Sequence, residues 1–196
     1  MTDLRVLRAA GRPAVPWRNG GGATREVASA PASAGADGFD WRVSLAEIAE
    51  DGPFSAFPDV DRILTVVEGD AGIELTVDGE RHGLERPFRP FAFPGDAATE
   101  CRLLGGPVTA LNLMTGRGRA AGRVEIVRDR AVEPAAEAGE ERLLVVLSGT
   151  ATLPAAALRL RRHDAIHHPA ASAAARTHVH GTAAVITVTT TRHPTP

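Results

Sequence analysis

The segment 15–27, VPWRNGGGATREV, combines residue types that rarely meet in an ordinary surface turn. A tryptophan, two arginines, an asparagine and a glutamate surround three consecutive glycines. Glycine admits positive φ and lets the backbone come close to a ligand or to another strand. We therefore expect Gly20–Gly22 to form a tight bend that aims Asn19 and the residues 24–26 toward a shared site. The alternative is a bulged hairpin turn that binds nothing.

Further along the chain, two more arginines stand where strands could carry them into the same site. Arg42 and Ser44 are two residues apart, so on a strand their side chains share one face. On that face Arg42 would offer a bidentate fork to a carboxylate, and Ser44 would offer a neutral donor. Alternatively, Arg42 lies on the surface or pairs with Glu47. Arg62 begins a mostly apolar run that ends near Glu68, and an ion pair between these two is as well supported as a ligand contact.

Three other residues are candidates for the site, each with a structural alternative. Asn112 lies in the apolar run LNLM, where a buried amide needs a partner in the core or on a ligand. Asp96 ends the sequence FPGD and could bind a ligand or only cap that turn. Trp17 could form a wall over a planar ligand, or it could plug the core.

The elements that must position these residues are short strands. Runs such as 41–48, 62–69 and 108–115 are β-branched or alternate in polarity, and Gly, Pro or Asp-Gly bounds them. Many short strands at this spacing are typical of a β-sandwich or a β-barrel. We predict an all-β fold.

The chain also contains an internal repeat. Residues 62–69 match residues 142–149 in Arg, Leu, Val and Gly at an offset of 80, and Phe93-Pro94 matches His168-Pro169 at an offset of 75. Two copies of one β-unit leave this pattern. We predict an N-terminal barrel over residues 1–116 and a degenerate C-terminal barrel over residues 123–196.

The two copies differ in their polar residues. At the same offsets, the second copy has Ser148 where the first has Glu68, and Thr187 where the first has Asn112. Polar groups are costly to bury without partners, so a barrel that keeps them is expected to use them on a ligand. We therefore place the site in the N-terminal barrel.

These motifs together resemble the HutD/Ves family of bacterial bicupin proteins. The resemblance rests on the motifs at 16–26, 41–44, 93–96 and 112–114, which keep the family's order and approximate spacing. It implies two cupin-like barrels in one chain and a role in histidine utilisation, in which a small metabolite is bound and induction is limited. Urocanate, formylglutamate and formiminoglutamate are the candidate ligands that the resemblance implies.

A metal site is not expected. Metal-binding cupins use a His-x-His pair with a carboxylate and a further histidine. The N-terminal barrel has only His82, and no acidic residue follows His178 and His180 in the second. No other cofactor motif and no nucleophile with a base partner is present.

Composition and charge limit the classes of partner and the cellular location that we expect. The net charge is −2, and both signs are interspersed, which argues against nucleic acid or an anionic membrane as the main partner. There is no signal-peptide core, no apolar run approaches ~18 residues, and the single cysteine cannot form an internal disulfide. We expect a cytoplasmic protein. The sequence is compatible with a homodimer.

We therefore expect a protein that binds a small anionic metabolite in its N-terminal barrel and has a regulatory or buffering role. The alternative is a metal-independent hydrolase or isomerase of a histidine-degradation intermediate, with Glu26, Glu68 or Asp96 as acid or base. The predicted ligand-binding residues are Trp17, Asn19, Thr24, Arg25, Glu26, Arg42, Ser44, Arg62, Glu68, Asp96 and Asn112.

Overall fold

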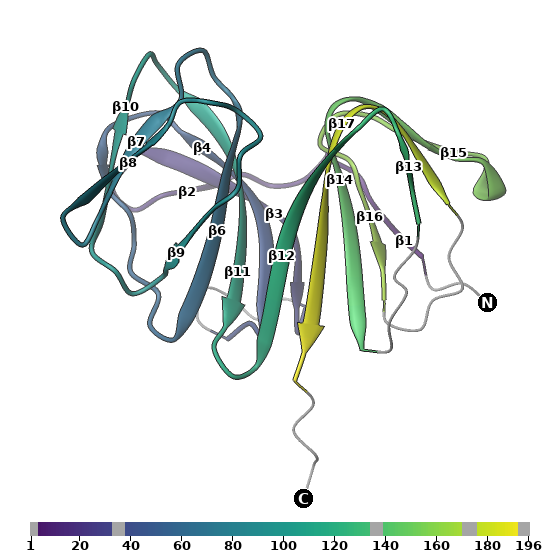
Figure 1. The fold of residues 1–196 in the computed structure, drawn as a ribbon, viewed down its shortest axis with the longest axis horizontal. Coiled ribbons are helices and arrows are strands. Elements are labelled where there is room, and N and C mark those ends of the chain that lie inside the picture. Colours follow the sequence, from purple (N-terminus) through teal and green to yellow (C-terminus); the bar gives the residue numbers. More distant parts are fainter. Residues whose placement is uncertain (1–3, 33–37, 134–138, 170–175, 192–196) are drawn as a thin grey trace, which may run out of the picture. The chain divides into compact units, whose positions relative to one another are not determined.

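The computed structural model of the protein describes residues 4–32, 38–133, 139–169 and 176–191. Across these ranges the chain is built of β-strands, and its only helical element is one 3₁₀ turn at Pro154–Ala156 (Figure 1). The predicted all-β fold is confirmed. None of the described residues forms a helix that is long and apolar enough to cross a membrane.

The chain divides into two compact units. The first unit is Pro13–Gly118, and the second unit is Met1–Arg12 together with Arg119–Pro196. Strand β1 (Arg5–Leu7) pairs with β16 (Ala165–His168) and so joins the second unit. The sequence predicts these residues in the N-terminal barrel of residues 1–116. A three-residue strand carries too little periodicity to indicate its partner.

Two antiparallel sheets form the first unit. The larger sheet has the order β2-β3-β4-β11-β6-β9, and the smaller has the order β5-β10-β7-β8. The strands of the larger sheet are β2 (Val15–Pro16), β3 (Gly22–Ala30), β4 (Trp41–Ile48), β6 (Val60–Glu68), β9 (Phe91–Pro94) and β11 (Val108–Gly116). Those of the smaller sheet are β5 (Gly52–Pro53), β7 (Ile73–Val77), β8 (Glu80–Leu84) and β10 (Thr99–Leu103).

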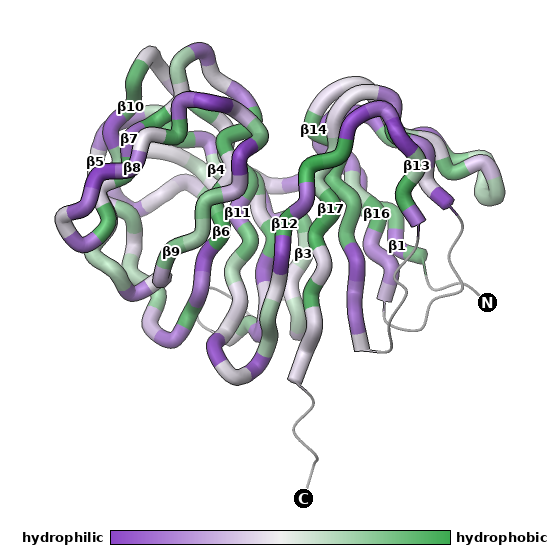
Figure 2. The backbone as a smooth tube through the Cα atoms, in the orientation of Figure 1, coloured by the Kyte–Doolittle hydropathy of each residue, from purple (hydrophilic) through white to green (hydrophobic). Residues whose placement is uncertain are grey.

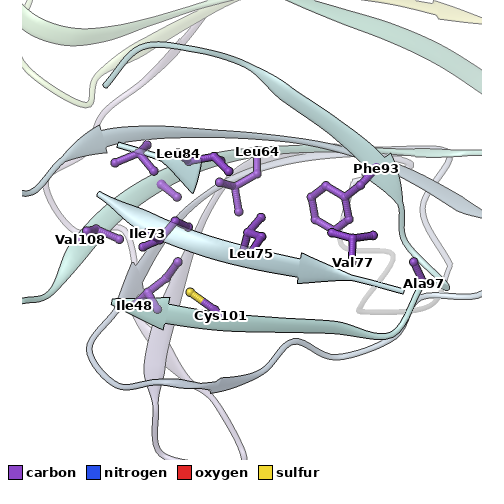
Figure 3. Packing of buried hydrophobic residues seen from close by; sticks show 12 residues of the cluster. Ile48, Leu64, Ile73, Leu75, Val77, Leu84, Phe93, Ala97, Cys101 and Val108 are labelled. Atoms are coloured by element: carbon purple, nitrogen blue, oxygen red, sulfur yellow. The ribbon is translucent and has the colours of Figure 1, made fainter. Parts of the chain in front are cut away.

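Apolar side chains from both sheets fill the core of the first unit. Figure 3 shows Leu64 and Phe93 of the larger sheet packed with Leu75 and Val77 of the smaller one. Burial of this apolar surface, at about 25 cal/mol per Å², is the main stabilising contribution. Along β6, Arg62 shares the inward face with Leu64, because residues two apart on a strand point the same way. The polar position Arg62, identified from the sequence, therefore lies directly beside the apolar core.

The described strands of the second unit form one sheet with the path β1-β16-β14-β17-β12, to which β13 and β15 are attached. Hydrophilic and hydrophobic residues alternate along β12 (Figure 2), as expected for a strand with one buried face. The remaining strands are β12 (Ala120–Arg128), β13 (Ala131–Val132), β14 (Glu140–Leu153), β15 (Leu158–Leu160) and β17 (Thr177–Thr190).

The two units share a strand order. The path β9-β6-β11-β4 in the first unit corresponds to β16-β14-β17-β12 in the second. Arg62 lies opposite Phe93, and Arg142 lies opposite His168, which agrees with the offsets of the sequence repeat. Both central strand pairs also have an irregularity in register at the corresponding place, between Thr109 and Ala110 in one and between Val146 and Ser148 in the other.

One equivalence taken from the sequence is wrong. Arg62 lies opposite Met114 on β11, and Arg142 lies opposite Thr187 on β17. Thr187 therefore corresponds to Met114, and Asn112 corresponds to Val185. Residues two apart on a strand face the same way, so a polarity pattern cannot detect a shift of two residues.

Gly20 and Gly21 lie in the turn between β2 and β3, and Gly22 is the first residue of β3. The amide of Trp17 donates to the carbonyl of Gly22 at 2.9 Å, and the amide of Gly20, which has φ +78°, donates to the carbonyl of Trp17 at 3.1 Å. A Cβ atom on Gly22 would lie 2.2 Å from the carbonyl oxygen of Glu47. Close approach of two strands therefore explains why residue 22 is glycine.

We expect Gly22→Ala to lower the free energy of unfolding by about 2 kcal/mol or more, because the carbonyl of Glu47 cannot yield without disturbing the sheet. Gly21→Ala is the matched control. Its Cβ would meet nothing closer than 3.6 Å, so its effect should stay within about 0.5 kcal/mol. Urea denaturation measures both, and equal losses in the two variants would contradict this account of the turn.

Candidate functional site

A cavity of about 580 Å³ lies in the first unit. This volume is typical of sites for small metabolites. Its walls come from strands β3, β4, β6 and β11 of the larger sheet, from the segment 15–19 and from the segment 53–57. Most of the lining is apolar or aromatic, and a few polar side chains are set among it.

Most of the predicted ligand-binding residues line this cavity. They are Trp17, Asn19, Thr24, Arg42, Ser44, Arg62 and Asn112. Strand register explains why they meet: Asn112 lies directly opposite Ser44 on β4, and Met114, two residues further on, lies opposite both Arg42 and Arg62. Because residues two apart share a face, these side chains project from one side of the sheet.

Two of the other predicted residues make contacts away from the cavity lining. Arg25 forms an ion pair with Glu47 at 3.3 Å, and both side chains are largely exposed. It neighbours Thr24 on a strand, so its side chain takes the opposite face of the sheet. Glu68 accepts a hydrogen bond from the hydroxyl of Thr109 at 3.1 Å. The sequence had placed both Arg25 and Glu68 among the ligand contacts.

Asp96 and Glu26 are likewise absent from the lining. Asp96 accepts hydrogen bonds from Nη1 and Nη2 of Arg117, each at 2.8 Å. The hydrogen bonds from Arg117 lower the pKa of Asp96, which therefore stays ionised at neutral pH. Glu26 lies opposite Ser44 and so shares the cavity face of the sheet, but its carboxylate is paired with Arg42.

Arg62 is the most unusual residue of the cavity. It is only 6% exposed, and its guanidinium carbon lies 4.9, 5.1 and 5.7 Å from the ring centres of Phe93, Phe54 and Phe57. Its Nη2 donates to Oδ1 of Asn112 at 3.3 Å, whereas its Nε has no partner. Within the described part of the chain, no carboxylate pairs with this cation.

The surroundings of Arg62 make it suited to an anion. Burial lowers the pKa of Arg62 to about 10, so the side chain remains protonated at neutral pH. Contacts with aromatic rings offset only part of the cost of burying a charge, typically ~0.5–2 kcal/mol. A ligand carboxylate would supply the missing negative charge and accept the remaining hydrogen bonds.

The second cavity arginine is held by protein groups. Nε of Arg42 donates to Oε2 of Glu26 at 2.8 Å, and the hydroxyl of Ser29 donates to Oε1 at 2.9 Å. Neither terminal nitrogen of Arg42 has a protein partner among the residues that the structure describes. Its outer N–H groups can therefore donate to a ligand while its charge is already balanced.

Trp17 forms a fixed wall of the cavity. Its Nε1 donates to the hydroxyl of Thr24 at 2.8 Å, and its ring meets Phe54 edge-on at 6.1 Å. Thr24 thus acts by orienting Trp17. Phe54, Phe57 and the exposed Arg18 at the cavity were not predicted, although Arg18 lies inside the glycine motif and the run PFSAFP places two aromatics in a short connection.

The second unit offers an internal comparison for Arg62. Its counterpart Arg142 has a carboxylate nearby: Glu140 lies 3.8 Å from Arg142 and 3.2 Å from Arg123. Glu140 is two residues before Arg142 on its strand, and the residue two before Arg62 is Val60. The arginine at this strand position therefore has a protein carboxylate nearby in the second unit. In the first unit, none of the described carboxylates pairs with it.

The second unit contains the His-x-His pair of His178 and His180, and separately a contact at 2.8 Å between Nε2 of His167 and Oε2 of Glu141. His178 and His180 lie on β17, and the hydroxyl of Thr152 is 3.4 Å from Nε2 of His180. Among the described residues, no three or more His, Cys, Asp or Glu side chains form a group that could hold a metal ion.

Comparison with known proteins now identifies the family. A model of the HutD family matches residues 9–187. The chain belongs to the HutD family. It is 43% identical over 125 residues to a 21.2 kDa protein in the hutC 3′ region of Pseudomonas putida, and 38% identical over 125 residues to protein Ves of Citrobacter koseri. These matches cover 64% and 63% of this chain but 65% and 61% of the relatives, so they span slightly less than two thirds of the relatives' length.

Solved structures agree with this assignment. HutD from Pseudomonas fluorescens SBW25 has a TM-score of 0.83 and 34% identity, and the match covers 96% of this chain and 100% of that one. A cupin 2 conserved barrel domain protein from Leptotrichia buccalis has a TM-score of 0.54 at 8% identity, covering 86% of this chain and 88% of that one. The second likeness concerns the fold alone, and it supports the predicted cupin-like architecture.

Replacing Arg62 by methionine tests whether the buried cation serves the fold. We expect Arg62→Met to raise the free energy of unfolding of the unliganded protein by about 1 kcal/mol, because an uncompensated buried charge is removed. Arg142→Met is the matched control in the second unit. It removes the more buried of the two arginines beside Glu140 and leaves only the largely exposed Arg123, so we expect a loss of about 1–3 kcal/mol. Urea unfolding measures both, and a marked loss of stability in Arg62→Met would show that Arg62 is structural.

Proposed function

We propose that this HutD-family protein binds a small carboxylate metabolite of histidine degradation in the cavity of its first unit, in a regulatory or metabolite-buffering role. The observation that carries the proposal is Arg62, a buried cation on a cavity wall without a carboxylate partner in the described chain. Burying a guanidinium without a counterion costs free energy, and an anionic ligand that pairs with it would offset this cost. Family membership and the hutC-region relative connect the proposal with histidine utilisation.

The ligand carboxylate would lie against the terminal nitrogens of Arg62. Asn112, which now accepts from Nη2, can turn its amide nitrogen toward the same carboxylate as a second donor. Ser44 adds a hydroxyl on the neighbouring strand, and the residue is 3% exposed. This set of one cation and two neutral donors suits a carboxylate better than a phosphate, which carries more charge than one guanidinium balances.

The rest of the ligand would lie among aromatic side chains. Trp17 is held by Thr24, and Phe54 and Phe57 come from the opposite wall segment. These rings favour a planar or partly unsaturated body, because flat groups stack on aromatic faces. Urocanate has one carboxylate and a planar imidazole, whereas formylglutamate and formiminoglutamate each have two carboxylates and a planar polar group. These three are the ligands to test.

The placement of the candidate acids supports binding over turnover. A hydrolase or isomerase would need an acid or base facing the ligand. Glu26, Glu68 and Asp96 all lie outside the cavity lining, and each accepts hydrogen bonds from protein groups. No observation in the first unit favours a catalytic role for one of them.

Titration calorimetry of the full chain with the three metabolites tests the proposal. We expect at least one to bind with a dissociation constant below 1 mM, and Arg62→Met to weaken it about 100-fold, as loss of a buried charge-assisted bond does. Arg25→Gln, which removes a charge from the outer face of the same sheet, should leave affinity unchanged. Absence of binding by all three at millimolar concentration, or full affinity in Arg62→Met, would refute the proposal.

A further inference from the structure

We infer that Glu26 sets the charge of the ligand: it restricts the cavity to molecules with one buried carboxylate beside a neutral hydrogen-bonding group. The inference rests on the proposed function, because it takes the ligand carboxylate to lie at Arg62. It concerns a residue that lines no part of the cavity itself. Its effect comes through the arginine that it holds.

The two arginines of the larger sheet that line the cavity differ in how their charges are balanced. Arg42 and Arg62 both line the cavity from the larger sheet. Glu26 lies 2.8 Å from Nε of Arg42, so this pair is neutral as a whole. Counting only carboxylates of the described residues, Arg62 is the one arginine of these strands without a counterion, and one guanidinium balances one carboxylate. The wall is therefore matched to a single buried negative charge.

The geometry of Glu26 keeps the pair in place. Both carboxylate oxygens are engaged, Oε2 by Arg42 and Oε1 by Ser29 at 2.9 Å. Glu26 lies opposite Ser44 in register, which puts it on the cavity side of β3. The side chain of Arg42 is 17% exposed and that of Glu26 is 39% exposed, so solvent screens their charges only in part.

A second ligand carboxylate would meet an unfavourable environment at Arg42. The attraction of the guanidinium would be opposed by the carboxylate of Glu26, which already occupies the Nε side of that group. A neutral amide or imidazole meets no such repulsion, and it can accept from the outer N–H groups of Arg42. Arg18 also lies at the cavity but is exposed, where solvent weakens any ion pair.

The opposite face of the same strands offers a matched control. Glu47 pairs with Arg25 between β3 and β4, as Glu26 pairs with Arg42, but the Glu47 pair is largely exposed and outside the cavity lining. Glu26→Gln and Glu47→Gln thus remove the same charge from the same two strands. Only the first change frees an arginine that lines the cavity.

The probes are succinate and succinamate, which have the same carbon skeleton and differ in one carboxylate replaced by an amide. Calorimetry or ligand-detected NMR of the full chain is expected to give tighter binding of succinamate to the unmodified protein. In Glu26→Gln, succinate affinity should rise about 10-fold, while succinamate affinity changes less than about 2-fold. Glu47→Gln should keep the ratio of the unmodified protein.

Arg42→Gln gives a second, independent variant. It leaves Glu26 charged and unpaired, so the preference for succinamate should increase, and the double variant Glu26→Gln/Arg42→Gln should restore the original ratio. An unchanged ratio in both single variants, or the same shift in Glu47→Gln, overturns the inference while leaving carboxylate binding at Arg62 intact. If neither probe binds the unmodified protein at tens of millimolar, the inference is overturned, and the proposed function is decided separately by the titrations with the three metabolites.

Discussion

A buried guanidinium without a carboxylate partner in the described chain is the constraint around which the first unit is arranged. Arg62 stands between Val60 and Leu64 on one face of β6, and Leu64 packs in the apolar core (Figure 3), so the strand that carries the charge is anchored there. Three phenyl rings surround the charge and limit its access to water. The unit tolerates this unfavourable group because the packed sheets beside it contribute far more stability than one charge removes.

The second unit shows how the same scaffold behaves when the charge is balanced by protein. Arg142 occupies the place of Arg62, but Glu140 stands where the first unit has Val60. The presence of one carboxylate two residues away on the same strand thus distinguishes Arg142, which has a protein counterion, from Arg62, which can pair with a ligand. Within one chain, the two units therefore differ in chemistry more than in strand order.

The glycine motif contributes rigidity to the cavity wall. Gly22 lets β3 approach the carbonyl of Glu47, and the turn so formed presents Trp17 to the cavity, with its indole nitrogen bound to Thr24. A wall fixed in advance loses little conformational freedom when a ligand arrives. The motif thus contributes to binding mainly by fixing the backbone of the turn. This backbone in turn sets the positions of the motif's polar side chains.

The sequence by itself determined the all-β fold, the repeat of β-units, the family and seven of the residues that line the cavity, because alternation and local motifs are properties of neighbouring residues. Only the tertiary structure decided which arginine is buried without a counterion, and that Arg25 faces outward while Glu26 neutralises Arg42. It also assigned β1 to the second unit and shifted the equivalent of Thr187 by two residues. These features depend on strand partners and register, which join residues far apart in the chain, and a period of two leaves such pairings open.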